Sequence, residues 1–203
     1  MIKILIVEAQ TLLRDSLEHI IAEQADMEVA GKTNSASKSF ELCQKLKPDL
    51  VLMDIVTGHN DNGITWTAKI RQEFPNIKIV IMTSLPEITF IDRAKKAGAH
   101  SYIYKDSGYQ HLFYVIRSTM EGGGIYPGPA DNTHFAGKLT EEEIAVIRLI
   151  CQGLSRDVIA DELKMSEKKL KSAITSILDK TGFDSIMKFA IYALGHHLIV
   201  PDV

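Results

Sequence analysis

Four strand-like runs in the first half of the chain each finish at a polar residue. The runs and their polar residues are 2–7 with Glu8, 50–53 with Asp54, 79–82 with Thr83, and 101–104 with Lys105. Continuously apolar runs are typical of strands buried on both faces of a parallel sheet, and open α/β sheets bind ligands at the carboxyl edge. The pattern predicts two carboxylates, a hydroxyl and a lysine at that edge, a set that suits phosphoryl chemistry on an aspartate.

Amphipathic stretches with a period near 3.6 residues separate these runs. The predicted helices are 12–21, 35–46, 64–74, 88–97 and 110–120, and a short strand is predicted at 27–30. Five strand–helix units predict an α/β fold, a doubly wound sheet of five parallel strands with helices on both faces. This domain is predicted to span residues 1–120.

A glycine- and proline-rich stretch then interrupts the pattern, and predicts a linker over residues 121–137. Beyond it, residues 138–203 are predicted to form an all-α domain of four helices. Thr140 and Glu143 have the spacing of a capping box for the first helix. Ser155, Ser166 and Asp184 are the expected N-caps of the next three, which are predicted at 156–163, 167–180 and 185–194.

Composition excludes several classes of protein. No apolar run approaches the roughly 20 residues of a membrane span, so no membrane partner is expected. Cys43 and Cys151 each stand alone in a helical pattern, which predicts reduced thiols in a cytoplasmic protein and neither a disulfide scaffold nor a zinc site. The net charge of −3 gives no overall indication of nucleic-acid binding.

Local motifs identify both halves by resemblance. The second half resembles the helix-turn-helix effector of the LuxR/FixJ/NarL type, and the first resembles a response-regulator receiver domain with a flavodoxin-like fold. The residues that carry the effector resemblance are 139–143, 149–155, 159–160, 163, 165–167 and 170–171, with the glycine-rich 122–126 before the linker.

The receiver resemblance implies a role for each residue at the sheet edge. Asp54 would be the phosphoacceptor, Thr83 the hydroxyl that binds the phosphoryl group and Lys105 its cationic partner. Glu8 would lie near a Mg²⁺ ion, held also by Asp54 and by the backbone carbonyl of Val56. Tyr102 would be the aromatic switch residue.

Each of these residues also has a simpler interpretation. Thr83 could cap the following helix and Lys105 could be a solvated strand end. Tyr102 could belong to the core, and Glu8 could supply a negative charge to the first helix. Their coincidence at the ends of successive predicted strands favours the joint site.

Two features depart from the receiver pattern. Ala9 stands where a second acid normally contacts the metal, and a methyl group cannot bind Mg²⁺. The loop of residues 54–63 lacks the usual Met-Pro and is one residue longer than expected. Three outcomes are open: weak Mg²⁺ binding that retains waters, replacement of the missing ligand by Asp61, or a pseudo-receiver that works without phosphate.

The expected DNA-binding residues lie in the second half. Lys168, Lys169 and Lys171 gather positive charge at one end of the predicted recognition helix, as phosphate contact requires, and Arg156 in the preceding helix is a further candidate. The family commonly has Thr in place of Lys169. A lysine-decorated solvated helix is the simpler alternative.

These observations predict a DNA-binding transcription regulator and no enzyme, with a histidine kinase as partner and no small-molecule substrate beyond phosphodonors. Regulators of this kind usually bind DNA as dimers, so a homodimer is expected, with residues 185–194 as the interface. One alternative is a pseudo-receiver that binds a partner regulator and not DNA. Another is an aspartyl-phosphate phosphatase, which is disfavoured because Val56 stands where a second acid would be required.

Overall fold

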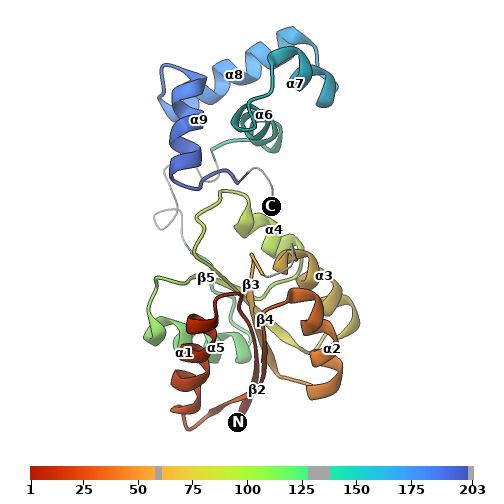
Figure 1. The fold of residues 1–203 in the computed structure, drawn as a ribbon, viewed down its shortest axis with the longest axis vertical. Coiled ribbons are helices and arrows are strands. Elements are labelled where there is room, and N and C mark those ends of the chain that lie inside the picture. The colour runs from red at the N-terminus through yellow and green to blue at the C-terminus, as the bar shows by residue number, and fades with distance from the viewer. Residues whose placement is uncertain (58–60, 128–137, 201–203) are drawn as a thin grey trace. The chain divides into compact units, whose positions relative to one another are not determined.

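The computed structural model describes residues 1–57, 61–127 and 138–200 of the 203-residue chain (Figure 1). The chain divides into two compact units. The first contains the sheet and the helices around it, and the second contains the four C-terminal helices.

The first unit is built on a five-stranded parallel sheet in the order β2-β1-β3-β4-β5. The strands are β1 (Ile2–Val7), β2 (Met27–Thr33), β3 (Leu50–Asp54), β4 (Lys78–Thr83) and β5 (Ser101–Tyr104). Val7 pairs with Met53, Asp54 with Met82, and Thr83 with Tyr104. This register aligns the carboxyl ends of β1, β3, β4 and β5 at one edge of the sheet. The strand order and the parallel pairing confirm the predicted doubly wound fold.

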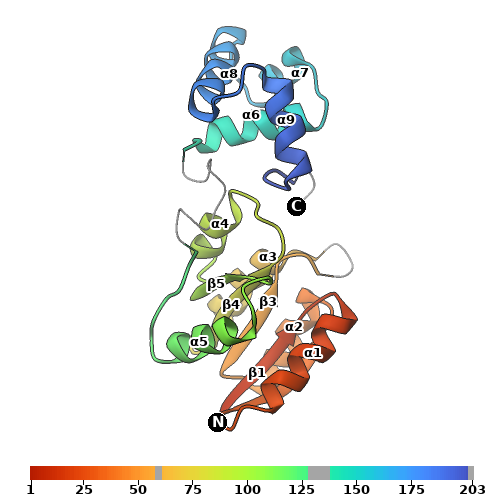
Figure 2. The ribbon, with the colours of Figure 1, turned by 90° about the vertical axis from the view of Figure 1, so that its left-hand side faces the viewer.

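Helices cover both faces of the sheet, as the right-handed crossovers require. They are α1 (Thr11–Ala22), α2 (Ala36–Leu46), α3 (Gly63–Glu73), α4 (Phe90–Lys96) and α5 (Tyr109–Met120). Helices α1 and α5 lie on one face and α2, α3 and α4 on the other (Figures 1 and 2). Side chains of alternate strand positions, such as Ile4 and Ile6, pack against Ile21 and Ile116 in the core under α1 and α5.

Local chemistry determines where α2 and α3 begin and end. The Ser35 side chain accepts a hydrogen bond from the Lys38 amide at the start of α2, and Lys47 adopts a left-handed conformation with φ of 49° just before Pro48. The Asn62 side chain accepts hydrogen bonds from the first amides of α3. These caps satisfy backbone groups that helix ends leave without intrahelical partners.

The first part of the predicted linker is packed against the sheet. The Tyr102 amide donates to the Ile125 carbonyl at 2.7 Å, and the Tyr126 hydroxyl donates to the Ala99 carbonyl at 2.6 Å. The compact first unit accordingly extends to Pro127. The rest of the predicted linker, residues 128–137, lies outside the described residues.

The second unit consists of α6 (Glu141–Cys151), α7 (Arg156–Glu162), α8 (Glu167–Thr181) and α9 (Ile186–Gly195). Its core includes Ile147, Ile159, Ile177 and Phe189, each no more than 1% exposed. The predicted capping box is present, because Thr140 and Glu143 each accept a hydrogen bond from the other's backbone amide. 

One predicted cap is wrong. Ser185, and not Asp184, occupies the N-cap position of α9, and the Asp184 carboxylate instead pairs with Lys188 at 2.6 Å. The two residues stand at positions i and i+4, a spacing that makes side chains neighbours on a helical surface. Lys188 in the first turn of α9 is therefore close enough to bind the Asp184 carboxylate.

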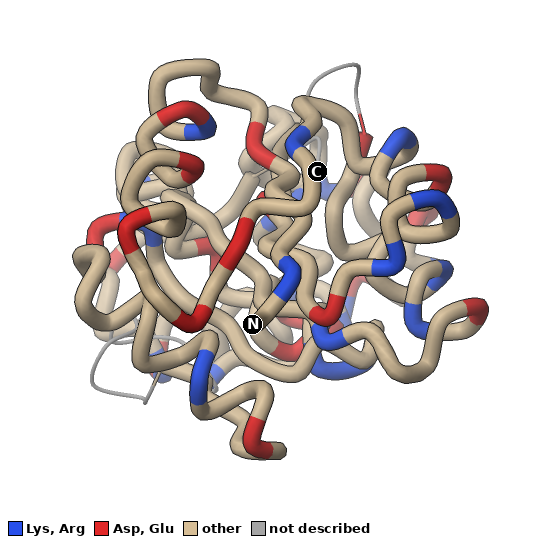
Figure 3. Tube along the Cα trace, turned by 90° about the horizontal axis from the view of Figure 1, so that it is seen from below, with Lys and Arg blue, Asp and Glu red and all other residues tan. Residues whose placement is uncertain are grey.

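Charges of both signs are interspersed along the chain (Figure 3), in keeping with the net charge of −3. In the parts of the chain that the structure describes, no helix combines the length and the apolar character needed to cross a membrane.

Candidate functional site

Polar residues meet at the carboxyl edge of the sheet in the first unit, where the sequence predicts them. Asp54 ends β3, Thr83 ends β4 and Glu8 follows β1. Lys105 follows β5, and its backbone amide donates to the Thr83 carbonyl at 2.9 Å. Glu8, Asp54 and Thr83 are 0%, 3% and 1% exposed. Charged groups are rarely buried to this degree unless they are paired.

Lys105 supplies that pairing. Its ammonium nitrogen lies 2.8 Å from Glu8 Oε2 and 2.8 Å from Asp54 Oδ2, and its side chain is only 10% exposed. The second carboxylate oxygen of Glu8 accepts a hydrogen bond from the Gln10 amide at 2.9 Å. We refer to Glu8, Asp54 and Lys105 as the ion triad. Two carboxylates and one ammonium leave it with a formal charge of −1.

The environment of Asp54 is that of a buried carboxylate held mainly by one cation. Burial raises the pKa of Asp54 to about 6; the charge of Lys105 opposes this rise and the nearby Glu8 adds to it. Asp54 is still largely ionised at neutral pH, as a nucleophilic carboxylate must be.

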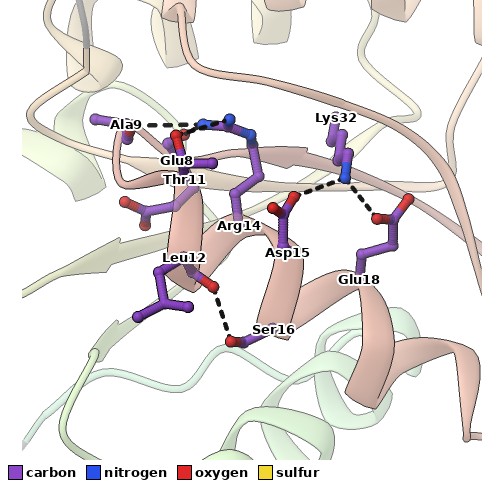
Figure 4. Close-up of polar contacts among 9 residues, drawn as sticks. All are labelled: Glu8, Ala9, Thr11, Leu12, Arg14, Asp15, Ser16, Glu18 and Lys32. Atoms are coloured by element: carbon purple, nitrogen blue, oxygen red, sulfur yellow. Dashed lines mark hydrogen bonds and ion pairs between the residues drawn. The ribbon is translucent and has the colours of Figure 1, made fainter.

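Arg14, in the first turn of α1, reaches back to the loop between β1 and α1 (Figure 4). The Arg14 guanidinium donates to the Glu8 carbonyl at 2.8 Å and reaches the Ala9 carbonyl at 3.4 Å. It also donates to the Thr11 hydroxyl at 3.3 Å. Arg14 thus fixes the backbone at the position where the second acid is missing, a role that the sequence analysis did not identify.

The described acid of the loop after Asp54, Asp61, binds the start of α2. The Asp61 carboxylate accepts hydrogen bonds from the Ser35 and Ser37 hydroxyls at 2.8 and 2.7 Å, at the start of α2. The structure gives no support to the alternative in which Asp61 replaces the missing metal ligand, because the Asp61 carboxylate is engaged by the N-terminus of a helix, a favourable environment for negative charge.

The oxygen donors that remain fit a weak magnesium site. They are the carboxylates of Glu8 and Asp54 and the Val56 carbonyl. The bridge between Val56 and Asn62 uses neighbouring amides and carbonyls, so it does not engage that carbonyl. Within the described residues no group of three His, Cys, Asp or Glu residues converges on a point. Mg²⁺ is often held by one or two carboxylates together with waters and substrate phosphates, and this donor set meets that minimum.

Tyr102, the predicted switch residue, is fully buried. Its ring packs edge-on against Tyr104 with 5.6 Å between centroids. Tyr102 lies on β5, three residues before Lys105, which directly follows this strand. A movement of the ring and a movement of the triad lysine are therefore linked by a short stretch of backbone.

In the second unit, α7 and α8 form a cleft that carries three of the four predicted DNA-binding residues. Arg156 comes from α7, and Lys168 and Lys171 come from the first turns of α8. The cleft has a volume of about 400 Å³ and is also lined by Asp157, Glu167 and Leu170. Three cations beside two carboxylates give it a formal charge of +1, a local excess in a unit whose sequence is otherwise balanced.

Lys169 is not in this cleft. Its ammonium group pairs with Glu142 of α6 at 2.5 Å. One residue corresponds to about 100° around a helix, so Lys169 faces α6, as do Ser176 and Lys180, which both bind Glu143. Lys169 therefore does not line the cleft with Lys168 and Lys171, and its part in DNA binding stays a prediction. The acids at the start of α6 were the available signal, but only the folded chain shows which lysine they meet.

Comparison with known proteins gives matches over both units. The family model described as "Response regulator receiver domain" matches residues 4–117, and the model described as "Bacterial regulatory proteins, luxR family" matches residues 137–193. The response regulator protein VraR of Staphylococcus saprophyticus is 30% identical over 207 residues, which cover 98% of this chain and 99% of that protein.

Solved structures agree with this assignment. A LuxR-family two-component response regulator from Aurantimonas sp. SI85-9A1 is 26% identical, with a TM-score of 0.59 over 62% of this chain and 89% of that chain. A structure of two RcsB dimers bound to two parallel DNAs has a TM-score of 0.71 and covers 95% of this chain and 98% of its own. At 18% identity, that likeness shows the fold alone.

Proposed function

The chain belongs to the two-component response regulators that join a receiver domain to a LuxR-type DNA-binding domain, and we propose that a partner histidine kinase controls it by phosphorylating Asp54. Members of this family are transcription regulators and not enzymes, and the C-terminal domain binds DNA. The proposal places the chain in the cytoplasm, where a kinase and the chromosome are both accessible.

The ion triad is the observation that carries this proposal. A carboxylate oxygen of Asp54 attacks the phosphorus of a phosphohistidine, the P–N bond breaks, and the electron pair remains on the imidazole nitrogen. The Lys105 ammonium already contacts Asp54 at 2.8 Å, so it is in position to balance charge on the incoming phosphoryl oxygens. Catalysis of this step is mostly positioning and charge neutralisation.

Two further residues complete the proposed site. The Thr83 hydroxyl, at the end of β4, donates a hydrogen bond to the phosphoryl group. Tyr102 transmits the change along β5. Glu8, Asp54 and the Val56 carbonyl would hold Mg²⁺, which would supply positive charge to neutralise part of the phosphoryl charge. With Ala9 in place of an acid, we expect its affinity to be reduced by about tenfold or more, by analogy with other altered metal sites.

For DNA, we propose that Arg156, Lys168 and Lys171 contact backbone phosphates, because they share one exposed cleft. Lys169 is left out of this set, since Glu142 already neutralises it. We propose α9 as the dimer interface. Its exposed stripe is formed by Met187, Ile191 and Leu194, which are 56%, 68% and 37% exposed, whereas Phe189 is in the core.

The intact mass of the protein after incubation with phosphoramidate and Mg²⁺ tests the phosphorylation proposal. One added phosphoryl group is expected in the native chain and none in Asp54→Asn. An adduct that survives in Asp54→Asn would show that another residue is the acceptor.

A second function is favoured by the same triad. Lys105 pairs with both Glu8 and Asp54, and a pseudo-receiver that binds a partner regulator would use this pairing in place of a phosphoryl group. In that case phosphoramidate gives no adduct, and the native chain does not bind DNA in a salt-dependent manner.

A further inference from the structure

The chain from Ile55 to Gly63, the first residue of α3, has two described arms, residues 55–57 and 61–63, which are hydrogen-bonded to each other. The Gly63 amide donates to the Ile55 carbonyl at 2.8 Å. The Asp61 carbonyl accepts from the Thr57 hydroxyl at 3.0 Å and from the Thr57 amide at 3.3 Å. The position of the second arm therefore determines the position of the first, which carries the Val56 carbonyl.

The second arm is packed directly on the backbone of the phosphoacceptor. A Cβ atom at Gly63 would lie 2.0 Å from the Asp54 carbonyl oxygen. Only glycine permits so close an approach. Because the two backbones are in contact, a displacement of this arm would also displace the backbone of Asp54.

Asp61 attaches both arms to α2. One carboxylate oxygen, Oδ2, accepts from the Ser35 hydroxyl at 2.8 Å, the Ser37 hydroxyl at 2.7 Å and the Ser37 amide at 3.1 Å. Hydrogen bonds from the Ser37 and Ser35 side chains lower the pKa of Asp61. Hydrogen bonds to an ionised acceptor are roughly twice as strong as neutral ones.

A second tie runs in parallel. The Ala36 amide, in the first turn of α2, donates to the Thr57 hydroxyl at 3.2 Å. Two residues of the loop, one on each arm, are thus bound to consecutive positions of α2. We name Thr57, Asp61, Ser35 and Ser37 the loop clip.

We propose that Asp61 is a positioning residue for the Asp54 site: through the loop clip it holds the Val56 carbonyl at the distance from Asp54 that phosphorylation requires. The inference rests on the proposed phosphorylation of Asp54. The loop has no proline to restrain its backbone, and the clip supplies by hydrogen bonds the rigidity that a proline supplies by its ring.

The test compares Asp61→Asn with Glu41→Gln as a matched control. Asparagine keeps the shape of Asp61 but loses its charge, and Glu41 is an exposed carboxylate on the same helix, α2. Amide hydrogen exchange is measured first, without metal or phosphodonor. We expect faster exchange at Ser37 and Thr57, whose amides donate to Asp61, in Asp61→Asn and no change in Glu41→Gln.

The initial rate of phosphorylation by phosphoramidate is measured next, over a range of Mg²⁺ concentrations. In Asp61→Asn we expect the rate to fall by about tenfold, the usual effect of losing a residue that orients a ligand, with a higher Mg²⁺ concentration for half-maximal rate. Ser37→Ala should give a smaller loss of the same kind, and Glu41→Gln none. Faster exchange with an unchanged rate would overturn the positioning role.

Failure of the proposed function gives a different result. If the native chain forms no phosphoryl adduct, Asp54 phosphorylation is rejected, and the positioning role, which depends on it, is rejected too. If the native chain is phosphorylated but exchange at Thr57 is the same in Asp61→Asn and in the native chain, only the loop clip is rejected.

Discussion

Two lysine–carboxylate clusters, one in each domain, have similar distances and very different surroundings. In the receiver, Lys105 lies 2.8 Å from two carboxylates, and the side chains of Lys105, Glu8 and Asp54 are 10%, 0% and 4% exposed. In the effector, Lys169 lies 2.5 Å from Glu142, and these side chains are 56% and 45% exposed. The shorter pair is the weaker one, because water screens exposed charges and buried ones are screened much less.

The comparison separates two uses of charge. The buried triad fixes three side chains for a reaction at one point, and removing one member leaves the others without compensation. The exposed effector charges act on a polyanion by number and by sign, so each contributes a modest share.

Substitution of Lys105 by Met is expected to lower the free energy of unfolding of the receiver by about 3 kcal/mol at neutral pH, because breaking a buried ion pair leaves an uncompensated charge. Urea unfolding followed by the fluorescence of Trp66, the single tryptophan of the chain, measures this in the correct domain. In a Glu8→Gln, Asp54→Asn background the same substitution should cost far less. An equal cost in both backgrounds would show that packing of the lysine stem, and not the triad, is responsible.

Glu143 is an intermediate case between the two clusters, with a buried carboxylate and a half-exposed partner. Burial alone would raise its pKa, but hydrogen bonds from Lys180 and Ser176 outweigh burial and lower the pKa to about 2. The folded effector therefore holds this proton less tightly than the unfolded chain. The resulting stability is fully present above pH 4.5, the ordinary value, and is lost as pH falls toward 2.

Glu143→Gln should consequently lower effector stability by about 2 kcal/mol at pH 7, through loss of the capping box and of charge-assisted hydrogen bonds. Scanning calorimetry between pH 7 and pH 2 measures the unfolding of the effector in the native chain and in the variant. The difference in stability between the two proteins should shrink below pH 4.5. A difference that is constant with pH would contradict the role of the ionised carboxylate.

Periodicity and strand ends were enough to predict the fold and the edge of the sheet at which the polar residues meet, because apolar runs and their terminal polar residues are local in sequence. Glu8, Asp54, Thr83 and Lys105 lie at one edge as expected. What sequence could not provide was the pairing of side chains across elements. Asp61 is close to Asp54 along the chain, yet it binds the start of α2, since three donors there outcompete a site that already holds two acids.

The same limit applies in the effector. Three lysines of α8 are nearly consecutive, and charge alone does not distinguish them. The helical period does, because it directs Lys169 toward α6 while Lys168 and Lys171 face the cleft. The position of Glu142 opposite Lys169 depends on how α6 packs against α8, which is a property of the folded core.

Lys171→Ala and Lys169→Ala should separate these two faces. Titration of a fluorescent random-sequence duplex, repeated at several salt concentrations, measures phosphate contact without knowledge of the target promoter. Lys171→Ala is expected to reduce the slope of log affinity against log salt by about 1 and to weaken binding by about tenfold at low salt. Lys169→Ala should change both quantities much less. Equal effects would return Lys169 to the DNA-binding set.

The smallest effect is expected for Glu142→Gln, which releases Lys169 from its partner. Stability should change by less than about 0.5 kcal/mol, as is usual for an exposed pair. Affinity for the same duplex should rise by about threefold, with a steeper salt dependence, because a neutralised cation becomes available to phosphate. The gain must disappear in a Lys169→Ala background. If it persists there, Glu142 acts by general repulsion of DNA, and the exposed pair has no specific part in tuning the affinity of the effector.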